Sequence, residues 1–155
     1  MRLTQWTDYA LRVLMYCAVH EGRETAPTIA EIASEHKISR SHLMKVVMTL
    51  AAHGWLSTTR GRGGGLRLLQ PATQIPIGEV VRQMEGDFDL VECFNPLNND
   101  CQLVSNCGLK GTLAKALQAY MQVLDEVTLA DVVGTPDRLS VMRFMPKADY
   151  SNWPL

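Results

Sequence analysis

The chain has 155 residues, of which 46% are hydrophobic and 20% are charged, and its net charge is −1. This composition suits one compact domain and excludes an intrinsically disordered chain. Since the sequence has no apolar stretch of 18 residues and does not begin like a signal peptide, we expect a cytoplasmic protein without a membrane span.

The charges are distributed unevenly along the sequence. No acidic residue occurs between Glu35 and Glu79, whereas this interval contains six lysines or arginines and three histidines. A purely basic block in a near-neutral chain is typical of a protein that binds a polyanion such as DNA. From charge alone, an ordinary solvated basic face is an equally good interpretation.

Capping residues and hydrophobic periodicity predict three helices in the first third of the chain, at about residues 4–20, 28–37 and 39–53. Thr28 and Glu31 form a capping box at the start of the second helix. The second and third helices are short and are separated by a short break, which is typical of a helix-turn-helix.

Two strand-like segments follow, at residues 55–59 and 66–69, and a glycine-rich basic turn joins them. The glycines match neither a phosphate-binding loop nor a dinucleotide-binding motif. A turn that approaches a DNA backbone closely is a better use of them. We therefore predict a mainly α fold with a small β-hairpin, that is, a winged helix-turn-helix followed by a long dimerisation helix.

The C-terminal half contains that long helix, at about residues 108–126, after a short helix at 77–85 and an irregular segment. Its apolar stripe predicts packing either on its own domain or on a second copy of the chain, and consists of Leu109, Leu113, Ala116, Leu117, Tyr120 and Leu124. We read residues 71–76 as a linker. The chain then divides into a winged helix-turn-helix region at 1–76, a region with the cysteine loop and the dimerisation helix at 77–133, and a tail at 134–155.

The four cysteines fall into two classes. Cys17 lies on the apolar stripe of the first helix, so we expect it in the core. Cys93, Cys101 and Cys107 lie within 15 residues of one another, in a chain where disulfides are a poor default. Three thiolates without a nearby histidine suit an iron–sulfur cluster with one iron open to an outside ligand. A zinc site, which usually has paired cysteines, and structural or redox-active thiols are the alternatives.

Several motifs resemble the iron–sulfur winged-helix repressors, a family that includes IscR and RirA. The resemblance covers about residues 1–133 and is carried by the segments 3–12, 39–47, 60–68, 90–93, 107–110 and 120–133. It implies a homodimeric DNA-binding repressor of transcription that holds a [4Fe–4S] cluster, or alternatively a [2Fe–2S] cluster, through Cys93, Cys101 and Cys107. No nucleophile–base pair or pair of catalytic carboxylates suggests an enzyme.

Within this family the likeness is greatest to the branch that senses nitric oxide. The resemblance then implies that Asp8 of the partner subunit is the fourth cluster ligand and that Arg12 couples this region to the cluster. Reaction of the cluster with nitric oxide would relieve repression by changing the spacing of the two recognition helices. From the sequence alone, Asp8 and Arg12 would be an ordinary i,i+4 surface ion pair. An iron-responsive (RirA-like) or redox-responsive regulator is the alternative function.

The start of the third helix and the hairpin turn carry the expected contacts to double-stranded operator DNA. These residues are Ser39, Arg40, Ser41, His42, Lys45, Arg60, Arg62 and Arg67. The first residues of a recognition helix reach base edges in the major groove, and an arginine at the wing tip can enter a narrow minor groove. For Lys45 and Arg67 a phosphate contact is the simpler expectation.

Overall fold

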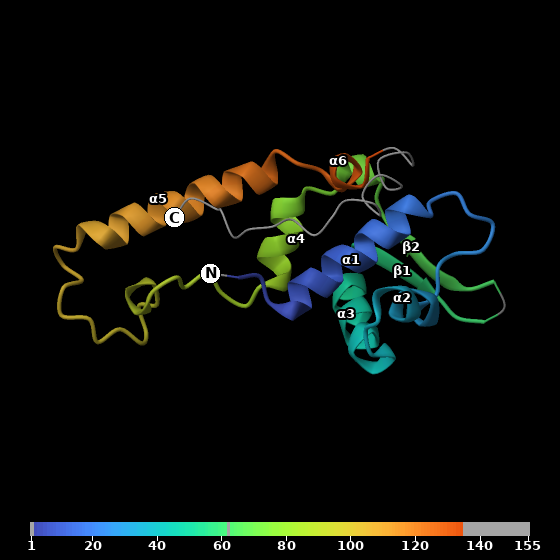
Figure 1. Ribbon diagram of the computed structural model, residues 1–155, viewed down its shortest axis with the longest axis horizontal. Helices are drawn as coiled ribbons and strands as arrows, with labels where there is room; N and C mark the ends of the chain where they lie inside the picture. Colours follow the sequence, from blue (N-terminus) through green and yellow to red (C-terminus); the bar gives the residue numbers. More distant parts are fainter. Residues whose placement is uncertain (1, 62, 135–155) are drawn as a thin grey trace, which may run out of the picture.

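The computed structural model describes residues 2–61 and 63–134 of the chain, and the fold within them is the expected mainly α architecture with one β-hairpin (Figure 1). In chain order its elements are α1 (Gln5–Val19), α2 (Ile29–His36), α3 (Arg40–Ala52), β1 (Leu56–Thr59), β2 (Gly65–Leu68), the 3-10 turn η1 (Ala72–Gln74), α4 (Ile77–Met84), the 3-10 turn η2 (Glu92–Phe94), α5 (Gly108–Asp125) and α6 (Leu129–Val133). Arg62 and all of the predicted tail except Gly134 lie outside the described residues.

Side-chain caps begin the helices where the sequence predicts them. The hydroxyl of Thr4 accepts a hydrogen bond from the backbone N–H of Thr7, and Ser39 caps α3 in the same way. Thr28 starts α2 with the predicted capping box, and Thr128 starts α6 with a second one. Because each cap uses only residues within one turn, the helix starts can be read from local sequence.

The hairpin is fixed to the segment that precedes α2. Strands β1 and β2 are antiparallel, with Leu56 opposite Leu68. The backbone N–H of Leu66 donates to the carbonyl oxygen of Pro27 at 2.8 Å. Gly65 permits this approach, because a Cβ atom there would lie 2.6 Å from the same oxygen. The wing therefore has a defined orientation relative to the helix-turn-helix.

One hydrophobic core joins α1, α2 and α3 to α4, α6 and the hairpin. The prediction of a linker at residues 71–76 was wrong in one respect, because Ile75 is completely buried. Its carbonyl oxygen accepts a hydrogen bond from Leu129, and the N–H of Ile77 donates to Val127. The core therefore continues across residue 76, and the two predicted regions share it.

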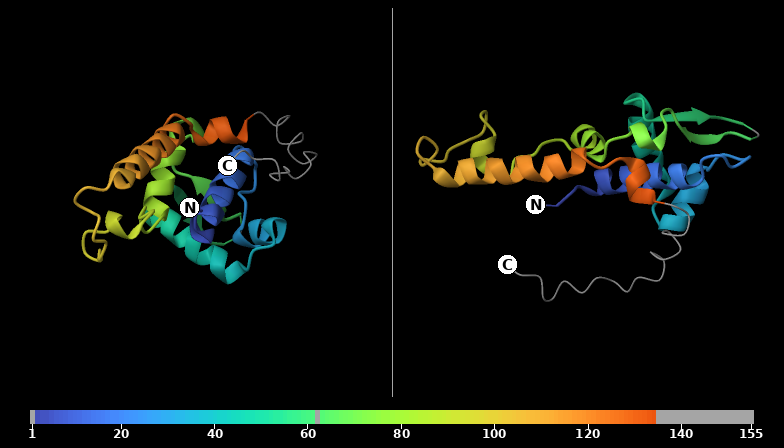
Figure 2. Two further views of the ribbon diagram at one scale, coloured as in Figure 1. Left: turned by 60° about the vertical axis from the view of Figure 1, so that its left-hand side comes forward. Right: turned by 90° about the horizontal axis from the view of Figure 1, so that it is seen from above.

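Helix α5 extends away from this body and carries the cysteine loop at its outer end (Figures 1 and 2). Its C-terminal end is fixed to α4 by a two-pronged ion pair between Arg82 and Asp125. Of its residues only Met121 is buried, whereas Leu117 is half-buried and Leu109 is 62% exposed. Much of the predicted apolar stripe thus has no cover among the residues that the structure describes. None of the described helices combines the length and the apolar character that a membrane crossing needs.

Candidate nucleic-acid interface and metal centre

The outer face of α3 carries most of the residues predicted to contact DNA. Arg40, Ser41 and Lys45 are exposed, while the opposite face of the helix is buried in the core. Ser39 is exposed as well, but its hydroxyl accepts from the backbone N–H of His42 at 3.2 Å and so caps the helix. The exposed face is therefore basic and hydroxyl-rich, as a DNA-reading helix requires.

His42 lies at the contact between α3 and α1 and is half-buried there. Its ring centroid is 5.8 Å from that of Trp6 and 5.3 Å from that of Tyr9. Together with Ser41 and Lys45, Trp6 and His42 line an open pocket of about 350 Å³. The structure therefore gives His42 a packing role that its sequence position did not reveal.

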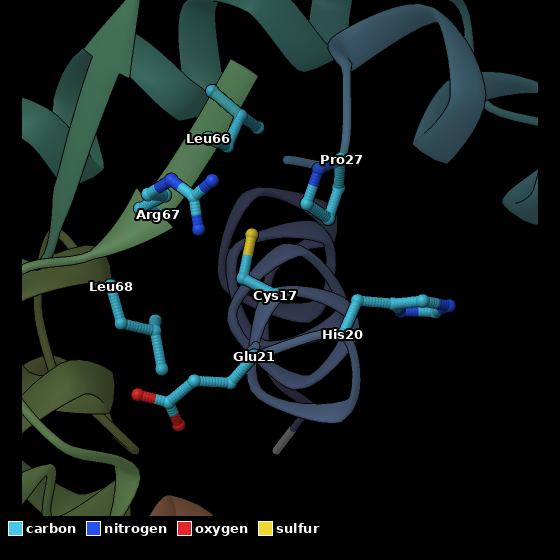
Figure 3. A pocket seen from close by; sticks show the side chains of 7 residues that line it. All are labelled: Cys17, His20, Glu21, Pro27, Leu66, Arg67 and Leu68. Atoms are coloured by element: carbon cyan, nitrogen blue, oxygen red, sulfur yellow. The ribbon is translucent and has the colours of Figure 1, made fainter. Parts of the chain in front are cut away.

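The hairpin presents two of the three predicted wing arginines, since Arg60 and Arg67 are exposed. Arg62 lies outside the described residues. Arg67 also lines a pocket of about 100 Å³ between β2 and the end of α1, together with Leu66 and Cys17 (Figure 3). A cation on β2 is therefore available to a polyanion that approaches the wing.

Cys17 belongs to the core, as expected. It is 4% exposed, and Figure 3 shows its sulfur directed from α1 toward β2. Burial raises the pKa of its thiol to about 12. A thiol that stays protonated is a poor metal ligand, because metals bind the thiolate.

The other three cysteines lie in the loop between α4 and α5, at the opposite end of the molecule from the hairpin (Figure 1). All three are free thiols; Cys93 is buried in η2, and Cys101 and Cys107 are half-buried. Soft sulfur donors of this kind suit iron in an iron–sulfur cluster. Among the described residues, however, no three cysteine, histidine or acidic side chains are close enough to hold a metal ion. The three thiols are therefore suitable ligands for a cluster, but they do not converge on one point within the described part of this chain.

Asp8 and Arg12 form the ion pair that their spacing predicts. The carboxylate of Asp8 lies 2.8 Å from the guanidinium of Arg12, and both side chains are about 40% exposed. The pair is close to His36 at the end of α2, whose pKa is lowered mainly by burial and further by the charge of Arg12. Asp8 thus lies on α1 in the helix-turn-helix body, and among the described residues it forms no metal-binding group with the loop cysteines.

Sequence reasoning missed one contact between this body and the cysteine loop. Glu85 directly follows α4, and its carboxylate accepts hydrogen bonds from the backbone N–H and the hydroxyl of Thr4, at 2.8 and 3.2 Å. The start of α1 is thereby tied to the start of the loop. No local signal indicates this pairing, because the two residues are 81 positions apart.

The sequence matches the Rrf2 family, described as iron-dependent transcriptional regulators, over residues 3–135. It is 48% identical over 139 residues to the HTH-type transcriptional regulator NsrR of Bacillus licheniformis, which covers 90% of this chain and 96% of that protein. It is 49% identical over 133 residues to NsrR of Bacillus subtilis, which covers 86% of this chain and 90% of that protein. The oxidised form of Staphylococcus aureus CymR has a similar fold, with a TM-score of 0.67 and 26% identity over 86% of this chain and 96% of CymR.

Proposed function

Since this chain belongs to the Rrf2 family, as an NsrR-type DNA-binding repressor of transcription, we propose that it holds an iron–sulfur cluster and that nitric oxide relieves repression by reacting there. Its relatives are transcriptional regulators, so its function is regulation and not catalysis. The observation that carries the proposal is the set of three free cysteines in one loop, without a disulfide among them.

Cys93, Cys101 and Cys107 would hold the cluster, which we propose to be [4Fe–4S] with [2Fe–2S] as the alternative. When bound, it would supply an iron that reacts with nitric oxide. The loop extends beyond the body of its own chain, which supports a contact with a second copy (Figure 2). The fourth ligand would then be Asp8 of the partner subunit. The apolar stripe of α5, exposed in one chain, supports such a homodimer.

The ion pair of Asp8 and Arg12 suggests how the site reaches DNA. In one chain Asp8 is held by Arg12, so ligation by Asp8 would require its carboxylate to leave that pair. Trp6 and Tyr9 flank Asp8 on α1, and both rings contact His42 on α3. A shift of α1 near Asp8 would therefore also shift the recognition helix α3, through these ring contacts. Dimeric helix-turn-helix proteins depend strictly on the spacing of their two recognition helices.

The test is a comparison of two cysteine variants after anaerobic purification. We expect the wild type to be brown, with absorbance at about 400 nm from thiolate-bound iron, and to lose operator affinity on exposure to nitric oxide. Cys101→Ala should lack the chromophore, whereas Cys17→Ala, altered only in the core, should keep it. Full cluster content in Cys101→Ala would refute the ligand assignment.

An iron-responsive regulator is the second candidate, because the family description itself names iron. The two candidates differ in which treatment abolishes DNA binding. If iron chelation releases the DNA and nitric oxide does not, the signal is iron supply. We expect the opposite order of sensitivity.

The assignment of Asp8 has its own test. Asp8→Ala should retain the chromophore, because three thiolates still hold the cluster, but its rate of reaction with nitric oxide should change. Arg12→Ala is the matched control, since it also removes the ion pair within α1 but leaves the carboxylate. Identical reaction rates in the wild type and Asp8→Ala would exclude Asp8 as a ligand.

A further inference from the structure

Two methionines on α3 lie where a soluble helix usually carries polar side chains. Met44 is 48% exposed and Met48 is 67% exposed, whereas the core side of the same helix is completely buried. They are four residues apart, which places them one above the other on the same face. Ser41 and Lys45 are exposed on that face as well. The methionines therefore form an apolar strip within the basic surface of the helix.

The surface around these methionines is basic, which distinguishes them from the exposed stripe of α5. They lie in the interval that has no acidic residue, next to Arg40 and Lys45. The charge of the surroundings favours a polyanion over a second copy of this near-neutral chain. Since the chain is a DNA-binding repressor, the expected occupant of this face is the major groove of double-stranded DNA.

Only one group on the base edges of the major groove is apolar, and that is the C5-methyl of thymine. Methionine is unbranched and polarisable, so it adapts well to a small apolar partner. We propose that Met44, and one turn later Met48, select thymine in the operator by contacting its C5-methyl groups. This inference rests on the proposed role of α3 as the recognition helix.

The rise of an α-helix separates the two methionines by about 6 Å along its axis. Base pairs in B-DNA are about 3.4 Å apart. Where α3 runs along the groove, the two contacted thymines should therefore be about two base pairs apart in each half-site. Met44 is nearer the start of the helix, where side chains reach deepest, so its thymine should matter more.

The experiment removes single methyl groups from DNA. The probe is a duplex that the full-length anaerobic protein selects from a random-sequence pool, resynthesised with deoxyuridine in place of one thymidine at a time. Loss of a methyl at a contacted position should weaken wild-type binding about fourfold, which corresponds to about 0.8 kcal/mol for one buried methyl-sized group. At one such position Met44→Ala should bind the thymidine and deoxyuridine duplexes equally well, and Met44→Leu should keep the preference there.

Lys45→Ala is the matched control on the same face. It should weaken binding to both duplexes by the same factor, because a phosphate contact does not sense a methyl group. If Lys45→Ala and Met44→Ala both bind like the wild type, α3 is not the DNA-reading helix and the proposed interface fails. If Lys45→Ala binds weakly but no deoxyuridine substitution affects the wild type, only the thymine contact is refuted. A methyl preference at one thymine position that survives in both Met44→Ala and Met48→Ala would also refute it.

Discussion

The thiol of Cys17 titrates differently in the folded and unfolded chain. Its ordinary pKa is 9.0, and burial raises the pKa to about 12 in the folded state. Between these values the unfolded chain binds fewer protons than the folded one, so this group lowers stability as the pH rises from about 9 to 12. We expect Cys17→Ala to lose less stability than the wild type across this window, as measured by urea unfolding at a series of pH values.

Other groups also titrate in this pH range, but the wild type and Cys17→Ala share them. Their effect on stability is therefore the same in both proteins. Tyr16, for example, also has a raised pKa, chiefly from burial and from its hydrogen bond to Glu31. Its contribution cancels in the difference between wild type and variant. Parallel stability curves above about pH 9 would show that Cys17 ionises as freely in the folded protein as in the unfolded one.

Single residues also show where the sequence predicted the site and where it did not. Arg40 and Lys45 could be predicted because charge and helical position are both local properties. Met44 and Met48 were not predicted as DNA contacts, although they lie outside the buried face of α3. The spacing of the cysteines in the sequence predicted Cys93, Cys101 and Cys107 as candidate ligands. Their relative positions could not be predicted, because the loop that carries them has no periodic structure.

At the scale of elements, Gly65 is the residue at which β2 packs closely against the segment before α2. A Cβ atom at this position would lie 2.6 Å from the Pro27 oxygen and 2.7 Å from the Ala26 oxygen. Gly65→Ala should therefore push β2 away from this segment and destabilise the fold by about 1–3 kcal/mol, the usual cost of overpacking. Urea midpoints measure the effect. Gly86→Ala is the control, since no atom lies within 4 Å of its added Cβ, and an equal loss there would contradict the steric explanation.

Helix α5 carries the second prediction at this scale. Leu117 belongs to its half-buried stripe, and a charge there would have to be buried in the proposed dimer. Leu117→Glu should therefore yield monomers or aggregates in sedimentation equilibrium, whereas Gln118→Glu, on an exposed position of the same helix, should leave the dimer intact. A wild type that sediments as a monomer at micromolar concentration would rule out this interface.

The elements themselves were predictable to different degrees, for a physical reason. Helix starts such as that of α2 depend on a cap and its partner three residues later, so short windows of sequence contain them. Ile75 and Met121 are buried by contacts with distant parts of the chain. A segment between two prolines therefore resembled a linker, although the carbonyl oxygen of Ile75 accepts a hydrogen bond from the distant residue Leu129.

For the whole molecule, charge distribution matters more than net charge. Four of the cations predicted to contact DNA are exposed among the described residues of each chain: Arg40, Lys45, Arg60 and Arg67. If each neutralises one phosphate, a dimer neutralises about eight, and log affinity should fall with log salt at a slope of about −7. Arg67→Gln should make this slope shallower by about 2, because each dimer loses two contacts. Lys115→Gln on α5 should not change it, and a slope near zero in the wild type would exclude phosphate contacts as the source of affinity.

In the proposed dimer, the exposed stripe of α5 couples folding to association. A chain that buries this surface only against a second copy gains stability from association, and that gain depends on how many copies are present. Each tenfold dilution should then cost about 1.4 kcal/mol per dimer and lower the melting temperature. A repressor that depends on such a dimer becomes less stable when its concentration falls. Its own concentration therefore helps to set the lifetime of copies that are not bound to DNA.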